Sequence, residues 1–287
     1  MKEYNMRISE SCAKCLYDRQ RKRIPDKDYL AEVRKLIENR SENDTSPLMV
    51  YRFDQVFRQR FGTADSYAEV KRRYNDLVLS MEEKLRGRIE AAKDPVATAL
   101  AFARIGNYID FGAMDSVNEE TFMQLFDGAE IRENEATVYR RFLDACANGR
   151  RFLLAADNCG EIVLDRLLLE QLKRRFPQLT FQVLVRGGEV LNDVTVPDAL
   201  YAGIDRVAEV LSNGEAIAGT VYEMMPEESR RALDHADIIL AKGQGNYESL
   251  SGQGRHVFYA FLCKCELFTS RFNVLPLTGM LVEELGA

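Results

Sequence analysis

From about residue 116 to its end, the sequence alternates short apolar runs with amphipathic helical patterns. The apolar runs include RFLLAA, TFQVLVR and DIILA. Parallel βαβ units give this alternation, because each parallel strand needs a crossover, usually a helix, to bring the chain back to the same edge of the sheet. We therefore predict an α/β fold, with a Rossmann-like, mostly parallel sheet in residues 116–287.

The individual elements follow from periodicity and from turn residues. The pattern predicts a helix in NEATVYRRFLDACANG that ends at Gly149, a strand over 151–156, a helix over about 161–176 and a strand over 180–186. Further along it predicts a short strand in RVAEVLSNG, a helix in MPEESRRALDHA, strands in DIILA and RHVFYAFLCKC, and then a C-terminal helix.

Residues 1–115 have a different pattern, in which apolar residues recur at a spacing of three to four and no run resembles a strand. Asp94 followed by Pro95 is typical of a helix start, and Gly62 and Gly112 are typical of helix ends. We predict a helical N-terminal domain of four or five helices over 1–115, followed by the α/β domain over 116–287.

Composition limits the possible partners. The chain has 287 residues and a net charge of −6, and its longest basic tract is RQRKR. A nucleic-acid-binding surface as the main function is therefore not expected. No run reaches the roughly 18 apolar residues of a membrane span, and the N-terminus lacks the apolar core of a secretory signal. We expect a cytoplasmic protein that binds small molecules, with no nucleic acid or membrane partner and an oligomeric state that the sequence leaves open.

The six cysteines suit reduced thiols better than structural disulfides. Cys12 and Cys15 have the spacing of a zinc half-site or of a redox pair, but no second CxxC accompanies them. Cys263 and Cys265 could meet them in a thiolate metal site, although buried or idle thiols are the simpler interpretation. The two histidines, His235 and His256, are expected to be structural.

Polar side chains follow the predicted strands where the strands end. Asp157 and Asn158 come directly after RFLLAA, and Asp193 follows TFQVLVR. The carboxyl ends of parallel strands form the usual ligand site of α/β proteins. Oxygen donors of this kind suit Mg²⁺, which is usually held by one or two carboxylates together with water and substrate phosphate. The alternative is that Asp157 and Asn158 only cap the next helix.

A second polar group lies in KGQGNYE, which follows the run DIILA. Two glycines, Lys242 and Asn246 could hold a phosphate at a helix N-terminus, although the Walker spacing is absent and a glycine-rich turn can be only a turn. Lys264 lies between two cysteines at the end of the last predicted strand, where it either meets an anion or reaches solvent.

Several motifs together resemble one family. DNCGE, RGGEVLNDVT, DIILAKGQGNYESL and FLCKCE occur in this order, together with CAKC near the start and GNYIDFG in the helical part. The set resembles the metal-dependent damage-control phosphatases, long catalogued as a domain of unknown function. The CAKC pair is similar to the stand-alone prokaryotic branch of that family. The resemblance implies a helical domain on a Rossmann-like domain, with a divalent metal at the strand ends.

Residue roles are implied only at positions that match the family. By this resemblance Asp157, Asn158 and Asp193 hold the metal, and Asp157, Asp193 and Lys242 are catalytic. The implied substrate-binding residues are Asn107, Asp110, Glu161, Arg186, Lys242, Asn246 and Lys264.

The predicted function is hydrolysis of phosphate monoesters of small metabolites, such as sugar phosphates or phosphorylated cofactor fragments, with Mg²⁺, Mn²⁺, Co²⁺ or Ni²⁺. The nucleophile is a metal-activated water or, alternatively, an aspartate. One rival is a carboxyl methyltransferase that uses S-adenosylmethionine, but DNCGE lacks a glycine-rich loop. The other rival is a non-catalytic metal-binding interaction protein, for which a row of polar strand ends would cost stability without use.

Overall fold

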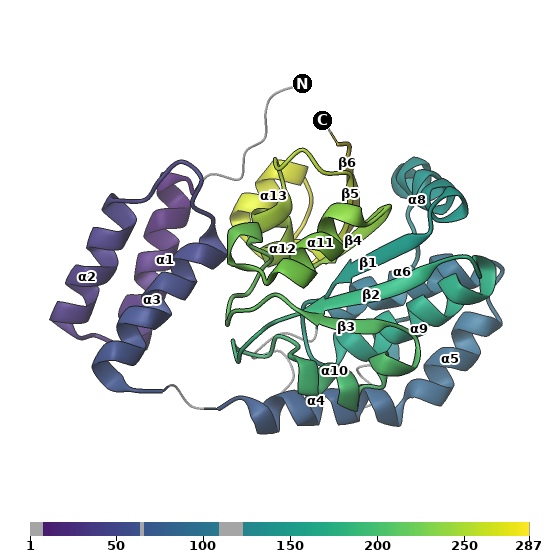
Figure 1. Ribbon diagram of the computed structural model, residues 1–287, viewed down its shortest axis with the longest axis horizontal. Coiled ribbons are helices and arrows are strands. Elements are labelled where there is room, and N and C mark those ends of the chain that lie inside the picture. Colours follow the sequence, from purple (N-terminus) through teal and green to yellow (C-terminus); the bar gives the residue numbers. More distant parts are fainter. Residues whose placement is uncertain (1–7, 64–65, 109–122, 287) are drawn as a thin grey trace.

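The computed structural model describes residues 8–63, 66–108 and 123–286, and within them a six-stranded sheet is the centre of the fold (Figure 1). The strand order is β3-β2-β1-β4-β5-β6. The strands are β1 (Arg151–Ala155), β2 (Thr180–Val185), β3 (Glu209–Ser212), β4 (Ile238–Lys242), β5 (Val257–Leu262) and β6 (Gly279–Glu284). Strands β1 to β5 run parallel to one another, which confirms the α/β fold with a mostly parallel sheet.

The C-terminal region differs from the sequence prediction. A short helix, α13 (Glu266–Phe272), is present, but the chain then returns as β6 and pairs antiparallel with β5 over six residue pairs. The segment GMLVEE has neither a long apolar run nor strict alternation, so its strand character comes from pairing with β5 rather than from its own sequence.

The helices of the N-terminal half are more numerous than predicted. Among the described residues they are α1 (Glu10–Arg23), α2 (Lys27–Glu38), α3 (Ser46–Phe61), α4 (Ala68–Ser80), α5 (Glu82–Glu90) and α6 (Pro95–Gly106). The continuous helical pattern around residues 66–92 divides at Met81, which ends α4 and begins α5.

Several predicted helix ends are confirmed. The Asp94 side chain accepts a hydrogen bond from the backbone of Ala97, with Pro95 in the first turn of α6. Gly62 ends α3 with a φ of 85°, which suits a residue without a side chain. Gly149 follows the last residue of α8 (Ala136–Asn148). Gly112 lies outside the described residues.

The sheet is covered by helices on both faces, because its strand residues alternate between two cores. Phe152 and Leu154 of β1 belong to one core, with helices α4, α5, α6, α8 and α9 (Glu161–Arg175). Leu153 and Ala155 belong to the other, with α11 (Glu227–His235), α12 (Gly243–Leu250) and α13. A smaller helix, α10 (Val196–Tyr201), packs near β3.

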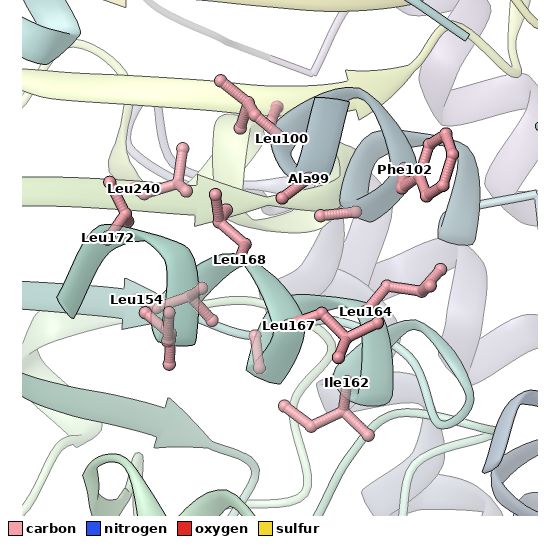
Figure 2. Packing of buried hydrophobic residues seen from close by; sticks show 14 of the residues in the cluster. Ala99, Leu100, Phe102, Leu154, Ile162, Leu164, Leu167, Leu168, Leu172 and Leu240 are labelled. Atoms are coloured by element: carbon pink, nitrogen blue, oxygen red, sulfur yellow. The ribbon is translucent and has the colours of Figure 1, made fainter. Parts of the chain in front are cut away.

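Helices α6 and α9 pack against each other in the first core (Figure 2). Leu164, Leu167 and Leu168 of α9 pack there against Ala99 and neighbouring residues of α6. Gly106, the last residue of α6, makes the close approach possible, since a Cβ there would lie 2.7 Å from the Leu164 side chain. The end of α6 is therefore pressed against the beginning of α9, where the polar residues begin.

Helices α1 to α3 form a separate group at one side of the molecule (Figure 1). Their apolar residues make a third core, which shares no residue with the two cores of the sheet. Helices α4 to α6 pack instead in the first sheet core. The division into two domains at residue 115 remains a prediction. In the described part of the chain, no helix has the length and apolar character needed to cross a membrane.

Candidate metal and phosphate site

The predicted site residues lie at one edge of the sheet, where the parallel strands end. Asp157 follows β1, Arg186 follows β2, Lys242 is the last residue of β4, and Lys264 follows β5. β1 lies between β2 and β4, so the strand order reverses at β1. The carboxyl end of a strand at such a switch point is where open α/β sheets bind ligands.

Backbone hydrogen bonds bring Asp193 to this edge. The Val194 N–H donates to the Asp157 carbonyl at 2.9 Å, and the Arg186 N–H donates to the Val194 carbonyl at 2.8 Å. Asn158 and Asp193 form an isolated antiparallel bridge. A loop that leaves β2 therefore returns to lie beside the end of β1, and it brings Asp193 next to Asn158.

The Asp157 carboxylate is held by donors on both oxygens. Its Oδ2 accepts from Nδ2 of Asn107 and from Nδ2 of Asn158, both at 2.8 Å, and its Oδ1 accepts from Arg186 at 3.3 Å. Burial, followed by the charges of Asp193 and Glu161, raises the pKa of Asp157 to about 7. A cluster of carboxylates with this property is stabilised by a cation.

Glu161 is the second acceptor for the same two amides. Its Oε2 accepts from Asn107 at 3.0 Å and from Asn158 at 3.1 Å. The N-cap of α9 is Gly160, and no side chain caps this helix end. Asp157 and Asn158 therefore do not serve as the helix cap that was the alternative interpretation.

Arg186 and Asn246 are engaged with the protein itself. Arg186 is 1% exposed and donates through Nε to Asp193 Oδ2 at 2.7 Å and through NH1 to Asn246 Oδ1 at 3.1 Å. The Asn246 amide donates to the carbonyls of Ala155, Ala156 and Lys242, at the ends of β1 and β4. The side chains of both residues hydrogen-bond to other residues of the site, whereas the sequence analysis predicted that they bind substrate.

Lys242 lies in a different environment from the expected phosphate contact. It is fully buried, and its ammonium donates to Glu161 Oε1 at 2.5 Å, to Asp165 Oδ1 at 2.7 Å and to the Ala103 carbonyl at 3.0 Å. An ammonium has three donors, and these three acceptors use all of them. Burial opposes its charge, but Asp165 and Glu161 outweigh burial and raise the pKa of Lys242.

Lys264 remains at the open side of the site. Its backbone N–H donates to Gln244 Oε1 at 3.1 Å, which ties the end of β5 to the first turn of α12. Its charge acts to lower the pKa of Asp157, so the ammonium lies within electrostatic range of that carboxylate. Asp110, the other predicted substrate residue of GNYIDFG, lies outside the described residues.

Two supporting residues were not expected from the sequence. Asn75 of α4 is buried, and its Oδ1 accepts from the Gly160 N–H at 2.6 Å, which fixes the turn between β1 and α9. Asp165 holds Lys242. A signal for Asp165 existed, because it lies four residues after Glu161 and therefore on the same face of α9.

The donor set suits a hard divalent cation. Asp157 and Asp193 supply carboxylates and Asn158 an amide, which is the incomplete oxygen set that Mg²⁺ commonly accepts from a protein. Gly243 leaves space for the Asp157 carboxylate, since a Cβ at position 243 would lie 2.0 Å from Asp157 Oδ2. The described residues contain no cluster of three or more His, Cys, Asp or Glu side chains that could hold a metal, so a cation at this edge would also take the amide oxygen of Asn158.

The other features singled out in the sequence lie elsewhere. All six cysteines are free thiols, with Cys12 and Cys15 in α1. A surface depression is lined by residues that include Arg150, Arg151 and Asp237, which precede or begin β1 and β4. It therefore opens at the amino ends of the strands, opposite the candidate site, and its mixed charges are already paired in part.

Comparison with known proteins gives consistent matches. The family profile described as "Damage-control phosphatase ARMT1-like domain" matches residues 7–274. A protein of Archaeoglobus fulgidus named a damage-control phosphatase is 32% identical over 278 residues, covering 91% of this chain and 93% of the relative. A damage-control phosphatase of Pyrococcus horikoshii is 27% identical over 217 residues, covering 74% of this chain and 72% of the relative.

The fold has a solved counterpart. A crystal structure of a Pyrococcus horikoshii protein of the DUF89 family superposes with a TM-score of 0.79 and covers 98% of this chain and 99% of its own. Its sequence identity of 22% supports the fold alone.

Proposed function

The chain belongs to the damage-control phosphatase ARMT1-like family, and we propose that its phosphatase activity resides at Asp157, Asn158 and Asp193. The Archaeoglobus fulgidus and Pyrococcus horikoshii relatives are named damage-control phosphatases, and the family is generally metal-dependent. The observation that carries the proposal is the convergence of two carboxylates and one amide at the sheet's switch point. The branch marked by an N-terminal CxxC remains a prediction.

The proposed substrate is a phosphate monoester of a small metabolite, such as a sugar phosphate or a phosphorylated cofactor fragment. The proposed metal is Mg²⁺, Mn²⁺, Co²⁺ or Ni²⁺, and the proposed location is the cytoplasm. A bound cation would neutralise phosphate oxygens and lower the pKa of an attacking water. Asp157, Asn158 and Asp193 would hold that cation.

The remaining residues bind and orient. The ammonium of Lys264 and the backbone N–H groups of the first turn of α12 attract phosphate oxygens, since a helix N-terminus is an anion site. Arg186 keeps Asp157 and Asp193 in place. Water is the favoured nucleophile, because both oxygens of Asp157 already accept hydrogen bonds and hold it in a fixed orientation.

The test is phosphate release from an aryl phosphate and a panel of sugar phosphates. Metal-stripped protein receives Mg²⁺, Mn²⁺, Co²⁺ or Ni²⁺ singly, and Asp157→Ala and Asp193→Ala are compared with wild type. The matched control is Asp144→Ala, which removes an exposed carboxylate of α8. We expect metal-dependent release in wild type and control, with a loss of about 100-fold or more in the two site variants.

Folded wild-type protein that releases no phosphate with any metal would contradict the proposal. It would favour the methyltransferase or the binding-protein interpretation. A folded Asp193→Ala variant with full activity would remove Asp193 from the metal ligands.

A further inference from the structure

The cluster beneath the candidate metal site contains more buried charge than packing requires. Lys242, Glu161 and Asp165 are each 0% exposed, and they lie between β4, α6 and α9. Buried ion pairs of this kind rarely add stability beyond what apolar residues of similar volume would give. Their hydrogen bonds indicate a role other than stability.

The hydrogen bonds run from the buried lysine to the metal-ligand candidates. Lys242 occupies Oε1 of Glu161, which leaves Oε2 for the amides of Asn107 and Asn158. Each amide then uses its second N–H on Oδ2 of Asp157. Two amides thus bridge two carboxylates, and the lysine anchors the inner carboxylate.

This arrangement fixes which way the Asn158 side chain points. The Asn158 nitrogen donates to Glu161 Oε2 at 3.1 Å and to Asp157 Oδ2 at 2.8 Å, so this end of the amide faces the two carboxyl groups. The amide oxygen of Asn158 then points to the opposite side. An asparagine without such partners could turn its amide by 180° and present its NH₂ group, which repels a cation.

We propose that Glu161, anchored by Lys242, is a positioning residue that orients the Asn158 amide so that its oxygen faces the divalent cation. The inference rests on the proposed metal site. Glu161 touches neither metal nor substrate, and it acts through Asn158 and Asn107. Lys242 has the same indirect role, in place of the phosphate contact expected from the sequence.

The test compares Glu161→Gln with Asp165→Asn. In Glu161→Gln, one end of the new amide carries NH₂, which meets either the Lys242 ammonium or the two asparagine amides, so donor faces donor. In Asp165→Asn, the side-chain oxygen still accepts from Lys242, and the acceptors of Asn158 are unchanged. The two variants alter the same buried cluster by one atom each, so Asp165→Asn is the matched control.

The readout is Mn²⁺ affinity by calorimetry, the visible spectrum of the Co²⁺ form, and thermal unfolding without metal. We expect Glu161→Gln to weaken Mn²⁺ binding about 10- to 100-fold and to alter the Co²⁺ spectrum, as supporting residues of metal sites typically do. Asp165→Asn should bind within about 2-fold of wild type. Equal affinity of Glu161→Gln and wild type, or equal weakening in both variants, overturns the inference.

Two further outcomes are distinguishable. Wild-type protein that binds no divalent metal refutes the proposed function and the inference with it, whereas normal metal binding in Glu161→Gln refutes the inference alone. If Glu161→Gln does not fold, Glu161→Asp provides the same test, since it keeps the carboxylate beside Lys242 but shortens the side chain by one methylene and withdraws the acceptor from the Asn158 amide. Weaker Mn²⁺ binding in folded Glu161→Asp supports the inference, and unchanged binding overturns it.

Discussion

At the scale of single residues, Gly243 is the tightest constraint on the site. It has a φ of +75°, and a side chain there would meet the carboxylate of Asp157. Both features exclude larger residues, because a Cβ is disfavoured in the left-handed region and would also displace the carboxylate. The glycine lets the first turn of α12 lie directly against the end of β1.

Gly243→Ala should therefore lower kcat/KM for aryl phosphate hydrolysis by about 100-fold, since an ångström-scale displacement of Asp157 misplaces a metal ligand. Gly87→Ala in α5 is the control, because no atom lies within 4 Å of its Cβ position. That variant should keep its activity and gain up to about 1 kcal/mol of stability from helix propensity. An active Gly243→Ala variant would show that Asp157 tolerates the displacement.

The residues of the site could be predicted from the sequence better than their roles. Motif order places Asp157, Asn158 and Asp193 at strand ends, which the structure brings together. Lys242 was expected at the phosphate, but strand alternation puts it on the same face as Leu240, toward α6 and α9. Which face of a strand meets which helices depends on tertiary packing, and a single sequence does not specify it.

At the scale of elements, α12 carries a titratable contact with the N-terminal helices. Glu248 of α12 lies near Ser46, the first residue of α3, and near Arg19 of α1. Burial raises the pKa of Glu248 to about 7, and Ser46 and Arg19 oppose this only in part. The folded protein therefore holds a proton that the unfolded chain releases at a lower pH.

The sign of the pH dependence follows from linkage. The contribution of Glu248 to the free energy of unfolding is fully present below the unfolded pKa and is lost as pH rises to about 7. Wild type should lose roughly 1–3 kcal/mol relative to Glu248→Gln between pH 4.5 and pH 8, measured by urea unfolding. A difference between the two proteins that stays constant with pH would contradict this assignment.

The elements themselves were largely predictable, with two informative exceptions. Strands β1, β2 and β4 could be predicted from their apolar runs, which arise because both faces of these strands are buried. β6 is an edge strand whose residues are mostly half-buried, so its sequence carries little signal. The sequence has no glycine or proline at Met81 that would predict the break between α4 and α5.

At the scale of the whole molecule, the core of α1 to α3 is independent of the sheet cores. Among the described residues, a polar contact of Tyr51 in α3 with Glu215 joins this group of helices to a loop of the α/β part, and Ser66, after the end of α3, contacts Glu189. Elements with few shared apolar contacts open at lower free energy than a central sheet.

Backbone amides of α1 to α3 should therefore exchange with solvent through an opening at least about 2 kcal/mol less costly than that of β1 and β4. Hydrogen exchange followed by mass spectrometry across a urea series measures both openings in one sample. If the helices and the strands merge into one exchange isotherm at every urea concentration, the molecule unfolds as a single unit.

The central position of β1 also has a consequence during synthesis of the chain. One edge of β1 pairs with β2, which is synthesised soon after β1. The other edge pairs with β4, which is synthesised more than 80 residues later. During that interval a nascent chain carries a buried-type strand with one open edge, which is a template for pairing with other chains. Protection of this edge by a chaperone, or fast synthesis of residues 186–242, would raise the yield of soluble protein.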